Sequence, residues 1–99
     1  MGMFKDKTLG ANESTDGIFL SGSCDVLVQG LTSGTVKLQY LLPASTENAS
    51  PSWEDFPEGA FTEDVYKTLF ISETKIQFRL TGVSNNADVY VRLGRYEYT

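Results

Sequence analysis

TVKLQY, at residues 35–40, alternates strictly between polar and apolar side chains. Val36, Leu38 and Tyr40 point to one side of an extended backbone, and the polar residues between them point to the other. A period of two, carried by β-branched and aromatic residues, is typical of a strand that buries one face. The stretch therefore predicts a half-buried β-strand.

The same alternation recurs toward the C-terminus. It is clean in KIQFRL at residues 75–80 and again in DVYVRL at residues 88–93, and shorter apolar runs lie upstream. Clusters of Gly, Pro, Asn and Ser separate the runs at intervals of roughly 8–12 residues, which is typical of antiparallel sandwiches. No stretch keeps a helical period over several turns. The pattern predicts an all-β fold, a single antiparallel β-sandwich of about seven strands.

The N-terminal part of the chain has a different character. Residues 1–16 are polar and show no sustained period. We therefore expect a flexible, extended N-terminal arm, followed by a β-sandwich domain over residues 17–99. The arm is either a frayed terminus or a segment that orders on a neighbouring chain. In the second case the docking residues are Phe4, Lys5, Lys7 and Leu9.

The composition excludes most catalytic machinery. The chain has no histidine, which removes the commonest general base, the commonest zinc ligand and the Ser-His-Asp triad. Cys24 is the one cysteine, so an internal disulfide is excluded, and its apolar neighbours predict a buried structural thiol. Glu54, Asp55 and Glu58 lack the spacing of a calcium loop, and a small sandwich rarely forms the cleft that paired-carboxylate hydrolysis needs. We expect no enzyme, no cofactor and no metal site.

Charge and hydropathy narrow the choice of partners. The net charge is −5, from 8 basic and 13 acidic side chains, which argues against nucleic-acid binding. No apolar run approaches the roughly 18–20 residues that span a membrane. The start MGMFKDKTLG has no apolar signal-peptide core. We therefore expect maturation in a reducing compartment, with neither nucleic acid nor membrane as a partner.

Two groups of aromatic residues are candidates for binding. Trp53 either plugs the open end of the core or forms a platform on which a carbohydrate ring stacks. The second group combines Tyr and Arg on faces expected to point outward, a combination enriched in protein interfaces, and the alternative is ordinary surface. We expect this group to mediate self-association. Its members are Tyr90, Arg92, Tyr96 and Tyr98.

The order of three phrases resembles that of small bacteriophage virion proteins. TSGTVKLQYLLP (residues 32–43) is similar to a strand with a Gly-Thr-Val/Leu-x-Leu-Gln motif. SWEDFPEGAFT (52–62) is similar to a Trp-x-Asp-Phe segment that continues with Gly and Phe-Thr, and KIQFRLTGVSNNADVYVRL (75–93) to a closing hairpin with Arg-Leu-Thr and Val-x-Val. The resemblance covers residues 17–93. It departs at the loop Pro43–Pro51, where a tighter Asp-Gly turn is expected.

The resemblance implies a small immunoglobulin-like sandwich that is not an enzyme and is located in the phage virion after synthesis in the host cytoplasm. The leading expectation is a capsid decoration (cement) protein. It would bind the major capsid protein or other virion proteins, stabilise the head shell and form a homo-oligomer. The alternative is a tail or head-fibre component, or a carbohydrate- or receptor-binding module built around Trp53.

Overall fold

The computed structural model describes residues 3–20, 22–42, 52–71 and 76–95 of the chain. These residues form eight strands and no helix. The strands are β1 (Met3–Leu9), β2 (Ile18–Phe19), β3 (Gly22–Gln29), β4 (Thr35–Leu42), β5 (Ser52–Phe61), β6 (Val65–Ile71), β7 (Gln77–Val83) and β8 (Val89–Arg95). The predicted all-β class is confirmed, with β1 as a strand that the sequence did not indicate.

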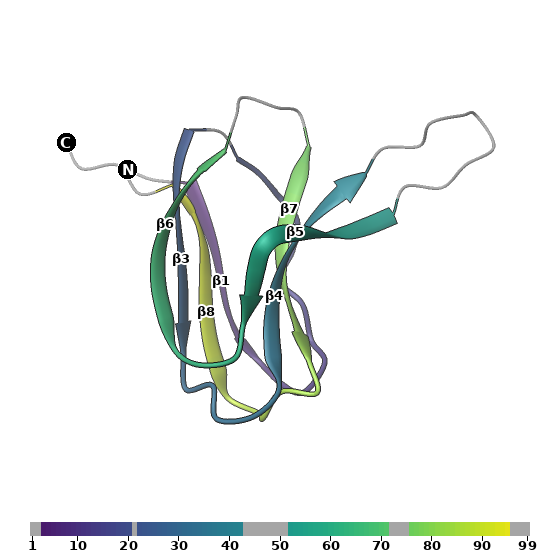
Figure 1. The fold of residues 1–99 in the computed structure, drawn as a ribbon, viewed down its shortest axis with the longest axis vertical. Helices are drawn as coiled ribbons and strands as arrows, with labels where there is room; N and C mark the ends of the chain where they lie inside the picture. The colour runs from purple at the N-terminus through teal and green to yellow at the C-terminus, as the bar shows by residue number, and fades with distance from the viewer. Residues whose placement is uncertain (1–2, 21, 43–51, 72–75, 96–99) are drawn as a thin grey trace.

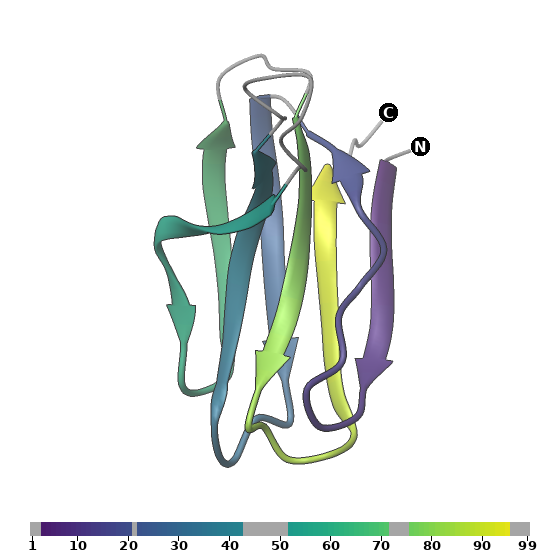
Figure 2. The same ribbon diagram turned by 90° about the vertical axis from the view of Figure 1, so that its right-hand side faces the viewer.

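The strands form two four-stranded sheets. Sheet A has the order β1-β8-β3-β6 and sheet B has the order β2-β7-β4-β5. Every pair of neighbouring strands is antiparallel. Figure 1 shows the sheets as two layers, with β6, β3, β8 and β1 on the left and β5, β4 and β7 on the right, and Figure 2 shows the strands lying side by side. The predicted antiparallel sandwich is confirmed.

The core lies between the two sheets and is built by the alternating residues. In β4, Val36 and Leu38 are fully buried, and Tyr40 packs against the same cluster. Other strands add further side chains without exposed surface, namely Val26, Val28, Leu80, Val89, Val91 and Leu93. Burial of one such side chain contributes about 1.5–3 kcal/mol. Because strands alternate, this layer also fixes which residues point outward.

The structure corrects the expectation of a flexible arm at residues 1–16. Met3–Leu9 forms strand β1, which pairs with β8 along its whole length. The strand is polar because it lies at the edge of sheet A. Lys5 and Lys7 are paired with core residues of β8 and point to the core side, yet they are exposed at the margin of the sandwich, and only Leu9 is buried. A strand with one buried residue has too weak an alternation to be detected from sequence.

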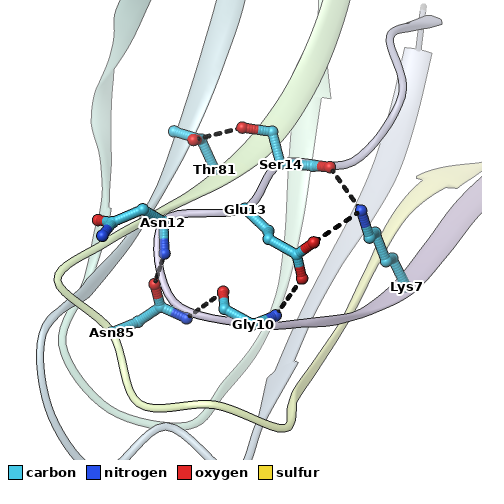
Figure 3. Close-up of polar contacts among 7 residues, drawn as sticks. All are labelled: Lys7, Gly10, Asn12, Glu13, Ser14, Thr81 and Asn85. Atoms are coloured by element: carbon cyan, nitrogen blue, oxygen red, sulfur yellow. Dashed lines mark hydrogen bonds and ion pairs between the residues drawn. The ribbon is translucent and has the colours of Figure 1, made fainter.

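The segment after β1 is hydrogen-bonded to β7 and to the turn that follows β7 (Figure 3). Asn85 accepts a hydrogen bond from the Asn12 backbone N–H at 2.9 Å and donates one to the Gly10 carbonyl at 3.2 Å. The Ser14 and Thr81 hydroxyl oxygens lie 2.6 Å apart. Residues 10–15 therefore belong to the sandwich rather than to an arm.

Strand β5 contains a large bulge. Its pairing with β4 runs from Ser52 to Asp55 and resumes at Ala60, so that four residues have no partner in the register. Glu58, inside the bulge, adopts a left-handed backbone with a φ of 60°. Figure 1 shows β5 bending sharply at this point. Residues 52–61 therefore form one bent strand.

Candidate contact surface

The outward-pointing side chains of sheet A form one continuous surface, which we call the aromatic face. Residues paired across an antiparallel ladder share a face, so the register defines its members. From β1 to β6 they are Phe4, Asp6, Thr8, Tyr90, Arg92, Ser23, Asp25, Leu27, Gln29, Tyr66, Thr68 and Phe70.

Large apolar side chains are exposed on this face. Phe70 is 76% exposed, Tyr66 60% and Phe4 41%. Leu27 lies between them, half-buried and directly opposite Tyr66 in the register. Phe4 lies on one edge strand of sheet A, and Tyr66 and Phe70 lie on the other. Several large apolar side chains exposed on one face of a sheet are typical of a surface that contacts another molecule.

The polar groups of the face are ordered by hydrogen bonds between strands. The Asp25 carboxylate accepts bonds from the Tyr66 hydroxyl at 3.2 Å and from the Thr68 hydroxyl at 3.1 Å. The Tyr90 hydroxyl donates to the Asp6 carboxylate at 2.9 Å. This bond raises the pKa of Tyr90 above its usual 10.0, because a donated hydrogen bond favours the protonated hydroxyl. The bonds tie the side chains of Tyr66 and Tyr90 to neighbouring strands.

A shallow hollow lies at the end of the aromatic face, between β3 and β6. Its volume is about 270 Å³. The residues that line it are Leu27, Val28, Gln29, Asp64, Val65 and Tyr66. Asp64 is fixed there because its carboxylate accepts a hydrogen bond from the Leu31 backbone N–H at 2.8 Å. The hollow is large enough to receive one side chain of a partner.

Two sets of sequence-predicted residues meet on this face. Tyr90 and Arg92, predicted for self-association, both point outward from β8. Phe4, predicted for the arm, lies beside them, with the Arg92 guanidinium carbon 6.0 Å from the centre of its ring. The other two members of the self-association set, Tyr96 and Tyr98, lie outside the described residues.

The remaining docking residues of the predicted arm are placed elsewhere. Leu9 has no exposed surface and belongs to the core, so it cannot anchor the chain on a neighbour. Lys7 is exposed on the core side of β1, where its ammonium group lies 3.4 Å from the Ser14 carbonyl and 3.7 Å from the Glu13 carboxylate. Lys5 shares that side of the strand and is exposed.

The β6 half of the face was not predicted from the sequence. In the stretch YKTLFI at residues 66–71, both alternating sets contain large apolar residues. Periodicity alone therefore did not show whether Tyr66 and Phe70 or Leu69 and Ile71 point inward. The structure buries Ile71 and leaves Phe70 outside.

Trp53 does not plug the open end of the core, which was one of the two roles predicted for it. It lies on the outer face of sheet B, half-buried, with the Arg79 guanidinium carbon 4.3 Å from the centre of its ring. Arg79 donates two hydrogen bonds to the Gln39 side-chain oxygen at 2.9 and 3.1 Å. Gln39 in turn donates to the Asp55 carboxylate at 2.9 Å. A row of polar side chains therefore crosses sheet B beside the indole ring.

Asp55 ends this row and is charged. Its pKa is lowered from 3.8 by the hydrogen bond from Gln39 and, to a smaller extent, by the bond from Lys37, whose ammonium group lies 3.2 Å away. The carboxylate is already engaged by these two donors. Within the described residues, no group of three or more His, Cys, Asp or Glu side chains is arranged to hold a metal ion.

Cys24 is 1% exposed, and this confirms the predicted buried thiol. In the part of the chain that the structure describes, no helix has the length and apolar character needed to cross a membrane.

No family model, no curated protein and no solved structure matches this chain. Its function is therefore inferred from its own surfaces.

Proposed function

We propose that this chain is a non-enzymatic protein-contact module, and specifically a phage virion structural protein that decorates and stabilises the capsid shell. A tail or head-fibre position would use the same kind of contact. The observation that carries the proposal is the aromatic face, where Phe4, Tyr66 and Phe70 are exposed together on one sheet. In this proposal the protein is made in the host cytoplasm and resides in the virion.

The edges of sheet A support contact through its face. Edge strands attract other strands unless they are blocked, and charged side chains that point to the core side are one such block. Lys5 and Lys7 occupy this side of β1, and Lys67 occupies it on β6, opposite the buried Val26. Strand addition at either edge is therefore disfavoured, whereas the face carries no such block.

The size of the face suits a repeating lattice. Four strands about 4.8 Å apart and seven residues long, at about 3.3 Å each, span roughly 15 by 23 Å. A single contact of this size is weak. Many copies bound to one shell stabilise it together, because avidity multiplies modest contacts. The order of the three sequence phrases that resembles phage virion proteins supports the same assignment.

Co-sedimentation with capsids that lack this protein tests the proposal. The variant Tyr66→Ser/Phe70→Ser removes the two most exposed rings of the aromatic face. The matched control is Phe19→Ser, which removes a ring that is 56% exposed and belongs to sheet B. We expect saturable binding by the wild type and by the control, and at least about tenfold weaker binding by the double variant.

The outcomes of the co-sedimentation experiment test the capsid assignment and the role of the aromatic face separately. Absence of saturable binding by the wild type would overturn the capsid assignment. Equal binding by the wild type and the double variant would overturn the role of the aromatic face. Deletion of residues 1–16 is not a suitable variant, because it removes strand β1 from sheet A and exposes the edge of β8.

Carbohydrate binding is the second candidate, and Trp53 is the observation that favours it. Its ring lies on the outside of sheet B beside the polar row formed by Arg79, Gln39 and Asp55, and an indole with nearby hydrogen-bonding groups is a common way to hold a sugar. A glycan array with the wild type and Trp53→Ala tests this candidate. Glycan binding that depends on Trp53 would support it, and an array without signal would remove it.

A further inference from the structure

We infer that the aromatic face docks a second copy of this chain, with β8 of one copy lying across β3 of the other. The inference deepens the proposed function and rests on its claim that this face is a protein contact. A second copy is the partner because the charged and apolar groups of the two central strands complement one another under a two-fold rotation.

The central strands of sheet A are β8 and β3. A two-fold axis that runs between them, parallel to the strands and above the sheet, places β8 over the partner's β3. Because each sheet is twisted, the contact is centred on these inner strands and weakens toward β1 and β6. The axis preserves the level of each residue along the strand. Residues that pair across β8 and β3 within one copy therefore face each other between copies.

This geometry brings opposite charges together twice. Gly94 pairs with Asp25 and Arg92 pairs with Leu27 in the register of β8 and β3. Between copies, Gly94 lies level with the partner's Asp25, and Gly94 is itself buried within its own chain. Arg92 lies two residues from Gly94, about 7 Å along the strand. Its long side chain reaches the partner's Asp25, and the two-fold axis repeats this pair.

The hollow contributes the apolar part of the contact. Tyr90 pairs with Gln29 in the same register, and Gln29 and Leu27 line the hollow. The partner's Tyr90 therefore faces the rim of the hollow. An aromatic side chain at the mouth of a pocket is the typical energetic centre of an interface. The same rotation places the second Tyr90 at the second hollow.

The small area of the contact predicts a weak dimer. Two faces of roughly 15 by 23 Å bury roughly 700–1,000 Å² in total, which is below the usual size of stable interfaces. The dimer is therefore weak, with dissociation expected at roughly micromolar to millimolar concentrations. Such a contact is negligible in dilute solution and significant where many copies are held close together.

Sedimentation equilibrium of the full chain over a range of concentrations measures the association. We expect the mass to rise with concentration toward twice the 10.9 kDa of one chain. Arg92→Glu and Asp25→Lys each place like charges opposite each other at both symmetric positions, and each alone should weaken association at least about tenfold. Glu63→Lys reverses a charge on the exposed loop between β5 and β6 and controls for the change in net charge that Asp25→Lys makes. Circular dichroism and cooperative urea unfolding confirm that each variant is folded.

An equimolar mixture of Arg92→Glu and Asp25→Lys is the decisive sample. In a heterodimer the new carboxylate of one variant meets the new ammonium group of the other, and the native Arg92–Asp25 pair remains at the second position. We expect the mixture to associate about as strongly as the wild type. Only a contact between chains is restored by mixing, so a mixture that stays monomeric would overturn the inference.

The capsid experiment separates this inference from the proposed function. A wild type that stays monomeric at millimolar concentration and still binds capsids through the aromatic face would overturn the inference alone. A chain that dimerises with rescue by mixing and does not bind capsids would support the inference and remove the capsid assignment.

Discussion

Asn85 fastens the segment after β1 through both ends of its side-chain amide. Its oxygen accepts a hydrogen bond from the Asn12 backbone N–H at 2.9 Å, and its nitrogen donates to the Gly10 carbonyl at 3.2 Å. The residue is 4% exposed. Because Gly10 directly follows β1, this amide helps to hold β1 against β8. It thereby supports the position of Phe4 on the aromatic face.

Replacement of this amide should destabilise the fold. Asn85→Ala leaves the partly buried Asn12 N–H and Gly10 carbonyl without this partner, and we expect a loss of about 1–2 kcal/mol in the free energy of unfolding. Urea denaturation measures it. Gln29→Ala removes an exposed amide and should change stability by less than about 0.5 kcal/mol. Equal effects of the two variants would contradict the role of Asn85 as a structural clamp.

Alanine substitution should have different effects at Leu9 and Phe4, although both residues belong to β1. Leu9 has no exposed surface, so Leu9→Ala should cost about 3 kcal/mol of folding stability. Phe4 is 41% exposed, and Phe4→Ala should cost under about 1 kcal/mol while weakening contacts made by the aromatic face. Urea denaturation of both variants checks the difference. A neutral Leu9→Ala would mean that β1 is detached from the sandwich.

Gly34 and Gly22 form a matched pair for backbone strain. Their φ angles are +76° and +75°, a region that favours glycine. A Cβ on Gly34 would clash with the Ser84 carbonyl oxygen, whereas one on Gly22 would meet nothing within 4 Å. We expect Gly22→Ala to cost about 1 kcal/mol from conformation alone. Gly34→Ala should cost about 3 kcal/mol or more, because backbone must also shift. Thermal unfolding of both variants distinguishes the two costs.

The ionisation of Asp55 should depend on the polar row of sheet B. Its pKa is lowered from 3.8, first by the hydrogen bond from Gln39 and then by that from Lys37. A lowered pKa in the folded state stabilises the fold above pH 3.8, and this contribution is lost as the pH falls through the folded-state value. Carboxyl NMR titration should show Gln39→Leu raising the pKa of Asp55 toward 3.8. An unchanged titration curve would contradict the hydrogen bond as the main cause.

The sequence predicted the parts of the fold in which one alternating set is apolar and the other polar. Val36 and Leu38 in β4 are buried as expected, because their neighbours are Lys and polar residues. The alternation of apolar and polar residues does not identify a strand or its buried face where burial is partial. β1 buries only Leu9 at the edge of a sheet, so its apolar period is too short to see. In β6 both alternating sets are apolar, so the exposed Phe70 could not be assigned to a face.

Contacts between strands that lie far apart in the sequence could not be predicted either. The outward direction of Tyr90 and Arg92 followed from the alternation of β8. Their proximity to Phe4 depends on β1 pairing with β8, a partnership across nearly the whole chain that no local pattern specifies. The position of Trp53 depends likewise on the register between β5 and β4 and on the bulge that shifts it.

Hydroxyl-radical footprinting of the capsid-bound protein locates its contact surface, because exposed rings oxidise and covered rings do not. We expect Phe70, Tyr66 and Phe4 to be oxidised in the free chain and protected when it is bound. It also predicts that Phe19, on sheet B and 56% exposed, reacts equally in both states. Protection of Phe19 and Trp53, with Phe70 still reactive, would show that the contact lies on sheet B and would contradict the account.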